Sequence, residues 1–227
     1  MINRLPQLGE NMNSMTFHDL SVFDHFFFDL DGTLSDSKAD VLGSIEQAYK
    51  NLGFSYDKSK LRIGPLLPDI ISAISPALNE EERALAARTF RAVYAAGKYK
   101  NTVLFEGVAE FLDKLLAEGK TLYVATNKPK APTYEVLEKL GIKDKFLFVG
   151  TPDCTGDSLT KPEVLKMMVS MFDLEAGKCL MVGDTLPDIE AGRYAGMKTM
   201  GFLSGYGDAS FRNSHADFFF SSYKELL

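Results

Sequence analysis

Cysteine is scarce in this chain of 227 residues, with only Cys154 and Cys179 present. Two cysteines are too few for a disulfide framework, and neither lies in a Cys-x-x-Cys or Cys/His spacing that would bind zinc. The scarcity favours a reducing compartment, so we expect a cytoplasmic protein. Long hydrophobic runs are lacking too: no segment approaches the roughly 20 apolar residues that a membrane-spanning helix needs. We therefore expect no membrane partner.

An excess of basic residues is also lacking, since 25 Lys and Arg face 31 Asp and Glu, for a net charge of −6. Proteins that bind nucleic-acid polymers usually present a basic face, so we expect no such partner. An anionic substrate would instead need local positive charge. Residues 1–20 lack the apolar core of a signal peptide, and we predict that they form an N-terminal tail.

The chain does contain an alternation of short apolar segments and helical patterns. Apolar runs that end in polar loops predict strands at 21–28, 121–125, 146–149, 179–182, 198–202 and 218–220. Helical spacing lies between them, at 108–118, 134–140 and 162–172. Strands that alternate with helices of this length predict a parallel sheet covered on both faces. The predicted fold class is α/β, with a doubly wound parallel sheet.

The segment 38–102 breaks this alternation, because it has helical patterns and little that resembles a strand. It predicts a small all-helical cap domain inserted after the first strand. Residues 21–37 and 103–227 would then form the α/β core. Polar residues near 36–40 and 100–106 predict hinges between the two parts.

The first predicted strand leads into Asp29-Leu30-Asp31-Gly32-Thr33. Two carboxylates two residues apart can face one space, and Gly32 lets the backbone approach a ligand closely. Taken alone, Asp-x-Asp-Gly also suits a solvated turn or a calcium loop. Further polar residues follow later strands or begin helices, namely Thr126, Lys161, Asp184 and Asp188. In an open parallel sheet these positions converge at the carboxyl edge, where ligands bind.

With these motifs the chain resembles the haloacid dehalogenase superfamily, in the subgroup whose helical cap follows the first strand. It is most similar to phosphoglycolate-phosphatase-like hydrolases. The likeness rests on the motif from Asp29 to Thr33, on Thr126, on Lys161 and on Gly-Asp-x-x-x-Asp from Gly183 to Asp188. It implies an enzyme that uses Mg²⁺ to hydrolyse a small-molecule phosphate monoester through an aspartyl phosphate.

The resemblance assigns catalytic roles to four residues. Asp29 resembles the nucleophile that attacks phosphorus, and Asp31 resembles the acid that protonates the leaving alkoxide and then activates water. Lys161 would offset charge on the phosphoryl oxygens and on Asp29. Thr126 would donate its hydroxyl to a phosphoryl oxygen. By itself, Lys161 also reads as a surface lysine, and Thr126 as a residue that closes a turn.

Metal and substrate contacts are implied in the same way. Mg²⁺ would bind the carboxylates of Asp29 and Asp184 and the backbone carbonyl of Asp31. Asp188 would hold a metal-bound water or orient Lys161, or it would only complement a helix start. The remaining candidates for substrate binding are Gly32, Thr33, Asn127 and, in the cap, Arg62; basic residues such as Arg62 are also often solvated.

Several functions remain open at this point. Asp31 favours phosphate esters, because an acid is needed only where an alkoxide must be protonated. A nucleotide phosphatase of the 5'-nucleotidase type is the main alternative to a phosphoglycolate-phosphatase-like enzyme. A sugar-phosphate mutase is disfavoured, since 38–50 contains no His, and a catalytically silent binding protein of the same fold ranks lower. The expected partner is a small phosphorylated metabolite, and the expected state a monomer or weak homodimer.

Overall fold

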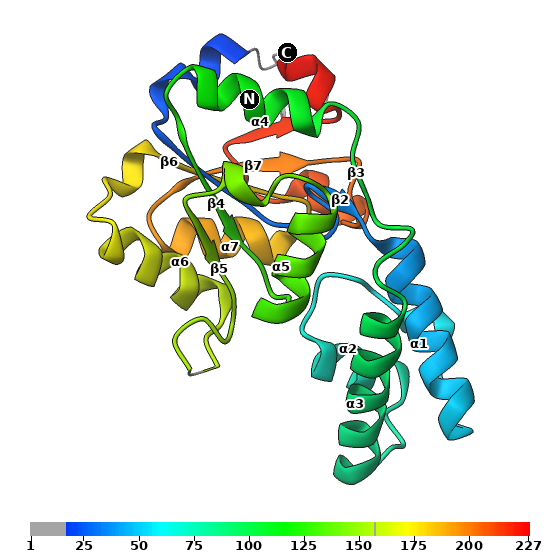
Figure 1. Cartoon of the computed structure of the whole chain (residues 1–227). Helices are drawn as coiled ribbons and strands as arrows, with labels where there is room; N and C mark the ends of the chain where they lie inside the picture. The colour runs from blue at the N-terminus through cyan, green and yellow to red at the C-terminus, as the bar shows by residue number, and fades with distance from the viewer. Residues whose placement is uncertain (1–16, 157) are drawn as a thin grey trace, which may run out of the picture.

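The computed structural model describes residues 17–156 and 158–227. At its centre lies a parallel sheet of six strands in the order β5-β4-β1-β6-β7-β8 (Figure 1). These strands are β1 (His25–Phe28), β4 (Thr121–Ala125), β5 (Phe148–Gly150), β6 (Cys179–Gly183), β7 (Lys198–Phe202) and β8 (Phe218–Phe220). All neighbouring strands pair in parallel, which confirms the predicted α/β class.

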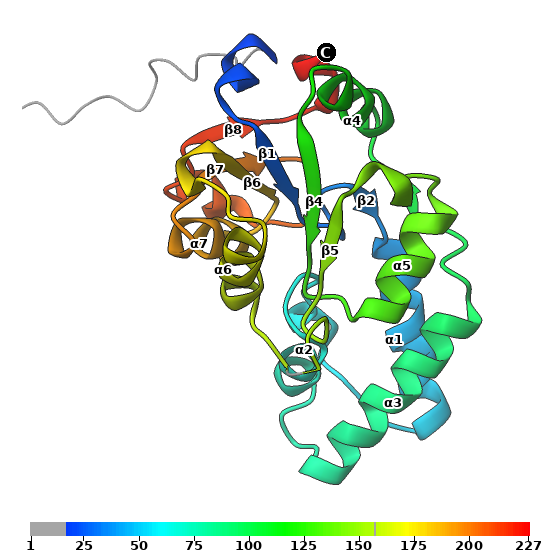
Figure 2. The same ribbon diagram turned by 60° about the vertical axis from the view of Figure 1, so that its left-hand side comes forward.

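Helices cover both faces of the sheet, because β1 is apolar on both sides. Phe26 and Phe28 belong to one hydrophobic cluster, whereas Phe27 belongs to another. The first cluster contains residues of α4 (Val108–Ala117) and α5 (Lys130–Lys139). The second contains residues of α6 (Lys161–Met171) and α7 (Leu186–Tyr194). The two helix pairs lie on opposite sides of the sheet (Figure 2).

The first strand is shorter than the sequence predicts. A 3₁₀ helix, η1, occupies Phe17–Val22, and β1 begins only at His25. Leu20 of η1 is buried in the first cluster, so the apolar run reflects two packed elements rather than one strand. Of the predicted tail at 1–20, residues 1–16 lie outside the described residues.

The segment after β1 forms a helical layer beyond the carboxyl end of the sheet (Figures 1 and 2). It consists of α1 (Lys38–Leu52), η2 (Lys58–Lys60), α2 (Leu67–Ile74) and α3 (Glu80–Ala96). Helix α3 begins with a capping box: Asn79 accepts a hydrogen bond from the Glu82 backbone, and the Glu82 carboxylate accepts one from the Asn79 backbone. We call this helical layer the cap.

Two connections join the cap to the core side by side. Strand β2 (Ser35–Asp36) pairs antiparallel with β3 (Val103–Leu104). Asp40 of α1 accepts hydrogen bonds from the Asn101 backbone and side chain at 2.9 and 2.8 Å and from the Thr102 hydroxyl at 2.7 Å. The entry to the cap and the exit from it are therefore tied together.

Short 3₁₀ helices complete the core at η3 (Lys143–Lys145), η4 (Ala176–Lys178), η5 (Ala209–Asn213) and η6 (Tyr223–Leu226). Within the described ranges, no helix combines the length and apolar character needed to cross a membrane.

Candidate active site

The sheet order brings three predicted site residues together. Strand β1 lies between β4 and β6, and Phe28 pairs with Val124 on one side and Val182 on the other. Asp29 follows β1, Thr126 follows β4, and Asp184 follows β6. Because parallel strands end at the same edge, these residues meet at the carboxyl end of the sheet.

Lys161 reaches this edge from the first position of α6. The start of α6 is stabilised by Glu163, whose carboxylate accepts a hydrogen bond from the Thr160 backbone at 2.7 Å. The Lys161 side chain is only 5% exposed; its Nζ lies 2.7 Å from Oδ1 of Asp29 and also donates to Oδ1 of Asp188. It is a buried lysine held by two carboxylates.

Asp29 and Lys161 each affect the pKa of the other. Burial raises the pKa of Asp29 to about 6, although the neighbouring Lys161 ammonium opposes this rise. Burial alone would lower the pKa of Lys161, but the carboxylates of Asp188 and Asp29 outweigh it and raise that pKa. Lys161 therefore stays protonated near neutral pH and favours the carboxylate form of Asp29, the form a nucleophile requires.

Asp184 is fully buried and held in place from two sides. Its Oδ1 accepts the Thr33 hydroxyl at 2.9 Å, and its Oδ2 accepts the Tyr206 backbone N–H at 2.7 Å. Burial, with Asp188 and Asp29 close by, raises the pKa of Asp184 well above its usual value. The carboxylate form of Asp184 thus needs a positive charge nearby.

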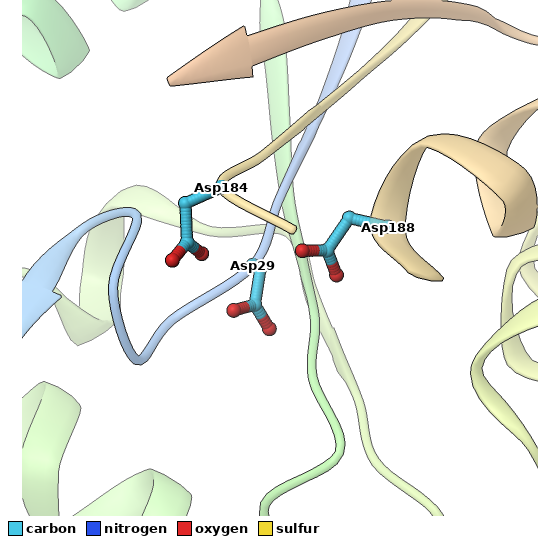
Figure 3. A group of neighbouring side chains, drawn as sticks. All are labelled: Asp29, Asp184 and Asp188. Atoms are coloured by element: carbon cyan, nitrogen blue, oxygen red, sulfur yellow. The ribbon is translucent and has the colours of Figure 1, made fainter. Parts of the chain in front are cut away.

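The buried acidic cluster has the composition of a divalent-cation site. Asp29, Asp184 and Asp188 each offer an oxygen, and these oxygens lie within 4.8 Å of one another. Figure 3 shows the three carboxylates converging from the β1 loop, the β6 loop and the start of α7. Three carboxylates face one ammonium, that of Lys161, which leaves excess negative charge in a buried space. The site therefore fits a divalent cation that prefers oxygen ligands.

Asp188 combines two of the three roles left open by the sequence, namely the contact with Lys161 and the support of a helix start. Its Oδ1 accepts the hydrogen bond from Lys161, while its Oδ2 accepts those of the Thr185 backbone and hydroxyl at 3.0 and 2.6 Å. It therefore orients Lys161 and also caps the start of α7. With both oxygens engaged, Asp188 is better placed to support the site than to bind a metal directly.

Asp31 points toward the cap and is paired with a residue that the sequence analysis missed. Nζ of Lys128 lies 2.7 Å from Oδ2 of Asp31 and 2.9 Å from the hydroxyl of Tyr94 in α3. The other carboxylate oxygen, Oδ1, is buried and has no hydrogen-bond partner. A buried oxygen without a partner is costly unless a ligand completes it, which suits an acid that meets a leaving group.

Thr126 and Asn127 lie at the boundary between core and cap. Thr126 is buried, and its hydroxyl oxygen accepts the Lys128 backbone N–H at 3.2 Å. The hydroxyl hydrogen stays available for a ligand. The Asn127 side-chain amide donates to the Gly64 carbonyl of the cap at 3.2 Å, so its expected contact with substrate would compete with this cap contact.

The glycine and threonine of the first motif lie against Asp184. A Cβ at Gly32 would come 2.3 Å from Oδ2 of Asp184, and Gly32 has a φ of 97°. Thr33 is fully buried, and its hydroxyl donates a hydrogen bond to Asp184. Both residues therefore shape the acidic cluster, whereas the sequence analysis predicts that they contact the substrate.

Arg62 is not among the residues that line the cavity between cap and core. It is exposed, and its guanidinium donates to the carbonyls of Ser59 and Leu61 at 2.9 Å each. This placement does not support the predicted contact with substrate. The neighbouring Ile63, Gly64 and Pro65 line the cavity instead.

Lys128, Tyr94 and Tyr206 are the residues that sequence reasoning missed. Lys128 stands in Thr126-Asn127-Lys128-Pro129 directly after β4, so its position past a strand end was an available signal. Tyr94 lies within a helical pattern, and Tyr206 is identified only by its contacts: its hydroxyl accepts the Ser37 backbone N–H and donates to Asp36. These contacts depend on long-range packing.

The fold and the site define a doubly wound α/β protein whose buried carboxylates and lysine meet at the carboxyl edge of a parallel sheet. The family model described as haloacid dehalogenase-like hydrolase matches residues 26–202. The chain belongs to this family, as its motifs predict.

Curated relatives agree with this family assignment. The phosphoglycolate phosphatase of Vibrio parahaemolyticus is 32% identical over 212 residues, which cover 88% of this chain and 92% of the relative. The 5'-nucleotidase of Pseudomonas aeruginosa is 29% identical over 197 residues, which cover 85% of this chain and 88% of the relative.

Solved structures show the same architecture. A predicted phosphoglycolate phosphatase from Haemophilus somnus matches with a TM-score of 0.79 and 29% identity, covering 89% of this chain and 95% of that one. A haloacid dehalogenase-like family hydrolase from Streptococcus pneumoniae matches with a TM-score of 0.80 at 24% identity, covering 90% and 97% of the two chains. With these relatives, the prediction of a phosphatase of this family is confirmed.

Proposed function

We propose that this chain is a Mg²⁺-dependent phosphatase that hydrolyses small phosphate monoesters through a phosphorylated Asp29. The observation that carries the proposal is the buried Lys161 ammonium, 2.7 Å from Asp29, beside an Asp31 carboxyl with one unpaired buried oxygen. A cation-stabilised carboxylate next to a second carboxyl is the pairing that nucleophilic and acid–base catalysis need.

The residues divide the reaction between them. An Asp29 oxygen forms a bond to phosphorus while the ester P–O bond breaks, and Asp31 gives its proton to the departing alkoxide. Water then attacks phosphorus and gives a proton to Asp31, which releases inorganic phosphate and restores Asp29. Lys161 and the Thr126 hydroxyl stabilise charge on the phosphoryl oxygens.

Mg²⁺, held by Asp29 and Asp184 with the Asp31 carbonyl, would neutralise phosphoryl charge beside the nucleophile. Thr33 and Tyr206 hold Asp184 ready for this role, and Asp188 keeps Lys161 pointed at Asp29. The same proposal includes a cytoplasmic location and a monomer or weak homodimer.

The test is release of inorganic phosphate with Mg²⁺, compared between the parent and Asp29→Asn. We expect the variant to lose at least about a thousandfold in kcat, because an amide cannot take the phosphoryl group. Asp24→Asn is the matched control, since Asp24 is an exposed aspartate just before β1. Equal turnover by Asp29→Asn and the parent would overturn the proposal.

A second candidate is a nucleotide phosphatase. The relative named 5'-nucleotidase favours it, as does a cavity of about 610 Å³ next to Asp29 and Asp31. Inclusion of adenosine 5'-monophosphate among the test substrates separates the two candidates.

A further inference from the structure

The cavity between cap and core is larger than a small organic acid needs. Its volume is about 610 Å³, which falls in the range of about 300–1,000 Å³ that holds drug-sized ligands. Asp29 and Asp31 line it, so it is continuous with the proposed phosphoryl site. The leaving group of an ester bound at Asp29 would therefore lie in this cavity.

Most of the cavity wall is apolar. The cap supplies aliphatic and aromatic side chains, among them Val41, Ile45, Ile63, Leu66, Ile70 and Phe90. The core supplies rigid rings at Pro129, Pro132 and Pro152. Burial of hydrocarbon against such a wall is favourable, whereas a polar group would lose its water without gaining a partner.

The aromatic residues of the wall offer rings rather than free hydroxyls. Phe90 stacks on Tyr94 with ring centroids 5.5 Å apart, and Tyr94 meets the edge of Tyr99 at 4.8 Å. The Tyr94 hydroxyl already accepts from Lys128, and the Tyr99 hydroxyl donates to Glu135 at 2.7 Å. Each of the two hydroxyls thus already has one hydrogen-bond partner within the protein.

The charged groups of the wall do not favour an acidic leaving group. Besides Asp29, the described lining residues include the carboxylates Asp31, Glu135 and Asp153 and the cations Lys128 and Arg91. Lys128 is paired with Asp31, and Arg91 is exposed to solvent, where its charge is screened. A carboxylate on the leaving group would find no unpaired buried cation among these residues, and the exposed Glu135 and Asp153 add no attraction for it.

We infer that the preferred substrate is a phosphate monoester of an uncharged alcohol with a mainly hydrocarbon body, rather than phosphoglycolate. This inference rests on the proposed function, since it takes Asp29 as the site where the phosphoryl group binds. The phosphoryl step is common to all substrates, and the cavity wall selects among the alcohols.

The test compares four esters that all release a primary alcohol: benzyl phosphate, ethyl phosphate, 2-phosphoglycolate and adenosine 5'-monophosphate. We expect kcat/KM for benzyl phosphate to exceed that for 2-phosphoglycolate by about tenfold or more, because the ring is buried and no carboxylate is desolvated. Ethyl phosphate, which has neither a ring nor a carboxylate, should fall between them. Equal or faster use of 2-phosphoglycolate or of the nucleotide would overturn the inference.

A charge placed in the wall tests the same idea from the protein side. Leu66 lines the cavity, and Leu66→Arg should shift the ratio of kcat/KM values toward 2-phosphoglycolate by about tenfold, as a new cation meets the carboxylate. Leu85→Arg is the matched control, because Leu85 is an exposed residue of α3 outside the cavity; it should keep the parent's ratio. An unchanged ratio in folded Leu66→Arg would contradict the placement of the leaving group.

These measurements distinguish a failure of the proposed function from a failure of the inference on the leaving group. If none of the four esters is hydrolysed with Mg²⁺, the proposed function falls and this inference falls with it. If 2-phosphoglycolate is the best substrate and Asp29→Asn is inactive, the proposed function stands and only the inference on the leaving group is overturned.

Discussion

Lys128 in the core joins Asp31 to Tyr94 of the cap, with Nζ 2.7 Å from the carboxylate and 2.9 Å from the hydroxyl. Nζ also lies 4.7 Å from the centroid of the Tyr94 ring. Burial alone would lower the pKa of Lys128, but Asp31 outweighs it and raises that pKa, so the ammonium stays charged. The position of the proposed acid is thereby coupled to the position of the cap.

Replacement of this lysine tests the coupling. Lys128→Met keeps the length of the side chain and removes the charge, so we expect kcat/KM to fall by about tenfold to a hundredfold, as a charge-assisted hydrogen bond is lost. Steady-state phosphate release measures the change. Lys130→Met is the control, because Lys130 is exposed and does not line the cavity. Unchanged kinetics in Lys128→Met would show that Asp31 is positioned without it.

The convergence of Asp29, Thr126 and Asp184 was predictable from the sequence. Each residue is marked by the local pattern around it, and the parallel sheet brings the three positions together. A polar residue after an apolar run marks a strand end, and parallel strands end at one edge. Lys161 was predictable only through the resemblance to the family, because one lysine before a helix has no distinctive pattern.

Other features depend on packing that no local pattern contains. Lys128 meets Asp31 and Tyr94 because the cap packs over the β4 loop, and Thr33 reaches Asp184 across a separation of 151 residues. Arg62 turns to the carbonyls of Ser59 and Leu61, which satisfy it locally. The start of β1 was misplaced because an apolar run fits a buried 3₁₀ helix as well as a strand.

Thr33 should control the affinity for metal through Asp184. Thr33→Val removes the hydroxyl that Oδ1 of Asp184 accepts at 2.9 Å, and loss of such a supporting hydrogen bond typically costs about tenfold to a hundredfold in metal affinity. The Mg²⁺ concentration for half-maximal activity should rise by that factor. Thr33→Ser keeps a hydroxyl and should restore most of the affinity. An unchanged Mg²⁺ dependence in Thr33→Val would refute this role.

His25 should make the fold less stable in acid. Burial lowers the pKa of His25 below 6.5, although Asp24 opposes the shift. The unfolded chain therefore binds this proton more tightly, and stability is lost as pH falls through about 6.5 toward the folded pKa. His25→Gln should lose less stability than the parent between pH 8 and pH 5.5 in urea denaturation, with His215→Gln as the exposed control. A parallel loss in parent and His25→Gln would argue against the shift.

Gly205 should be intolerant of a side chain because it packs against the acidic cluster. A Cβ there would lie 2.3 Å from the Gly32 carbonyl oxygen and 2.3 Å from Cβ of Asp184. Both neighbours belong to the site, so Gly205→Ala should displace Asp184 and cost about 1–3 kcal/mol of unfolding free energy through overpacking. Loss of Mg²⁺-dependent activity should accompany the loss of stability.

The matched substitution is Gly43→Ala in α1, where an added Cβ meets nothing within 4 Å. Alanine is the better helix former, so Gly43→Ala should raise the free energy of unfolding by about 0.5–1 kcal/mol and leave activity unchanged. If the cluster is packed as described, urea denaturation should show a loss of stability for Gly205→Ala and a gain for Gly43→Ala. Phosphate release should fall for Gly205→Ala only. A Gly205→Ala variant as stable and active as the parent would mean that the β7 loop has room to move away from Asp184, and the tight packing around that carboxylate would no longer explain its position.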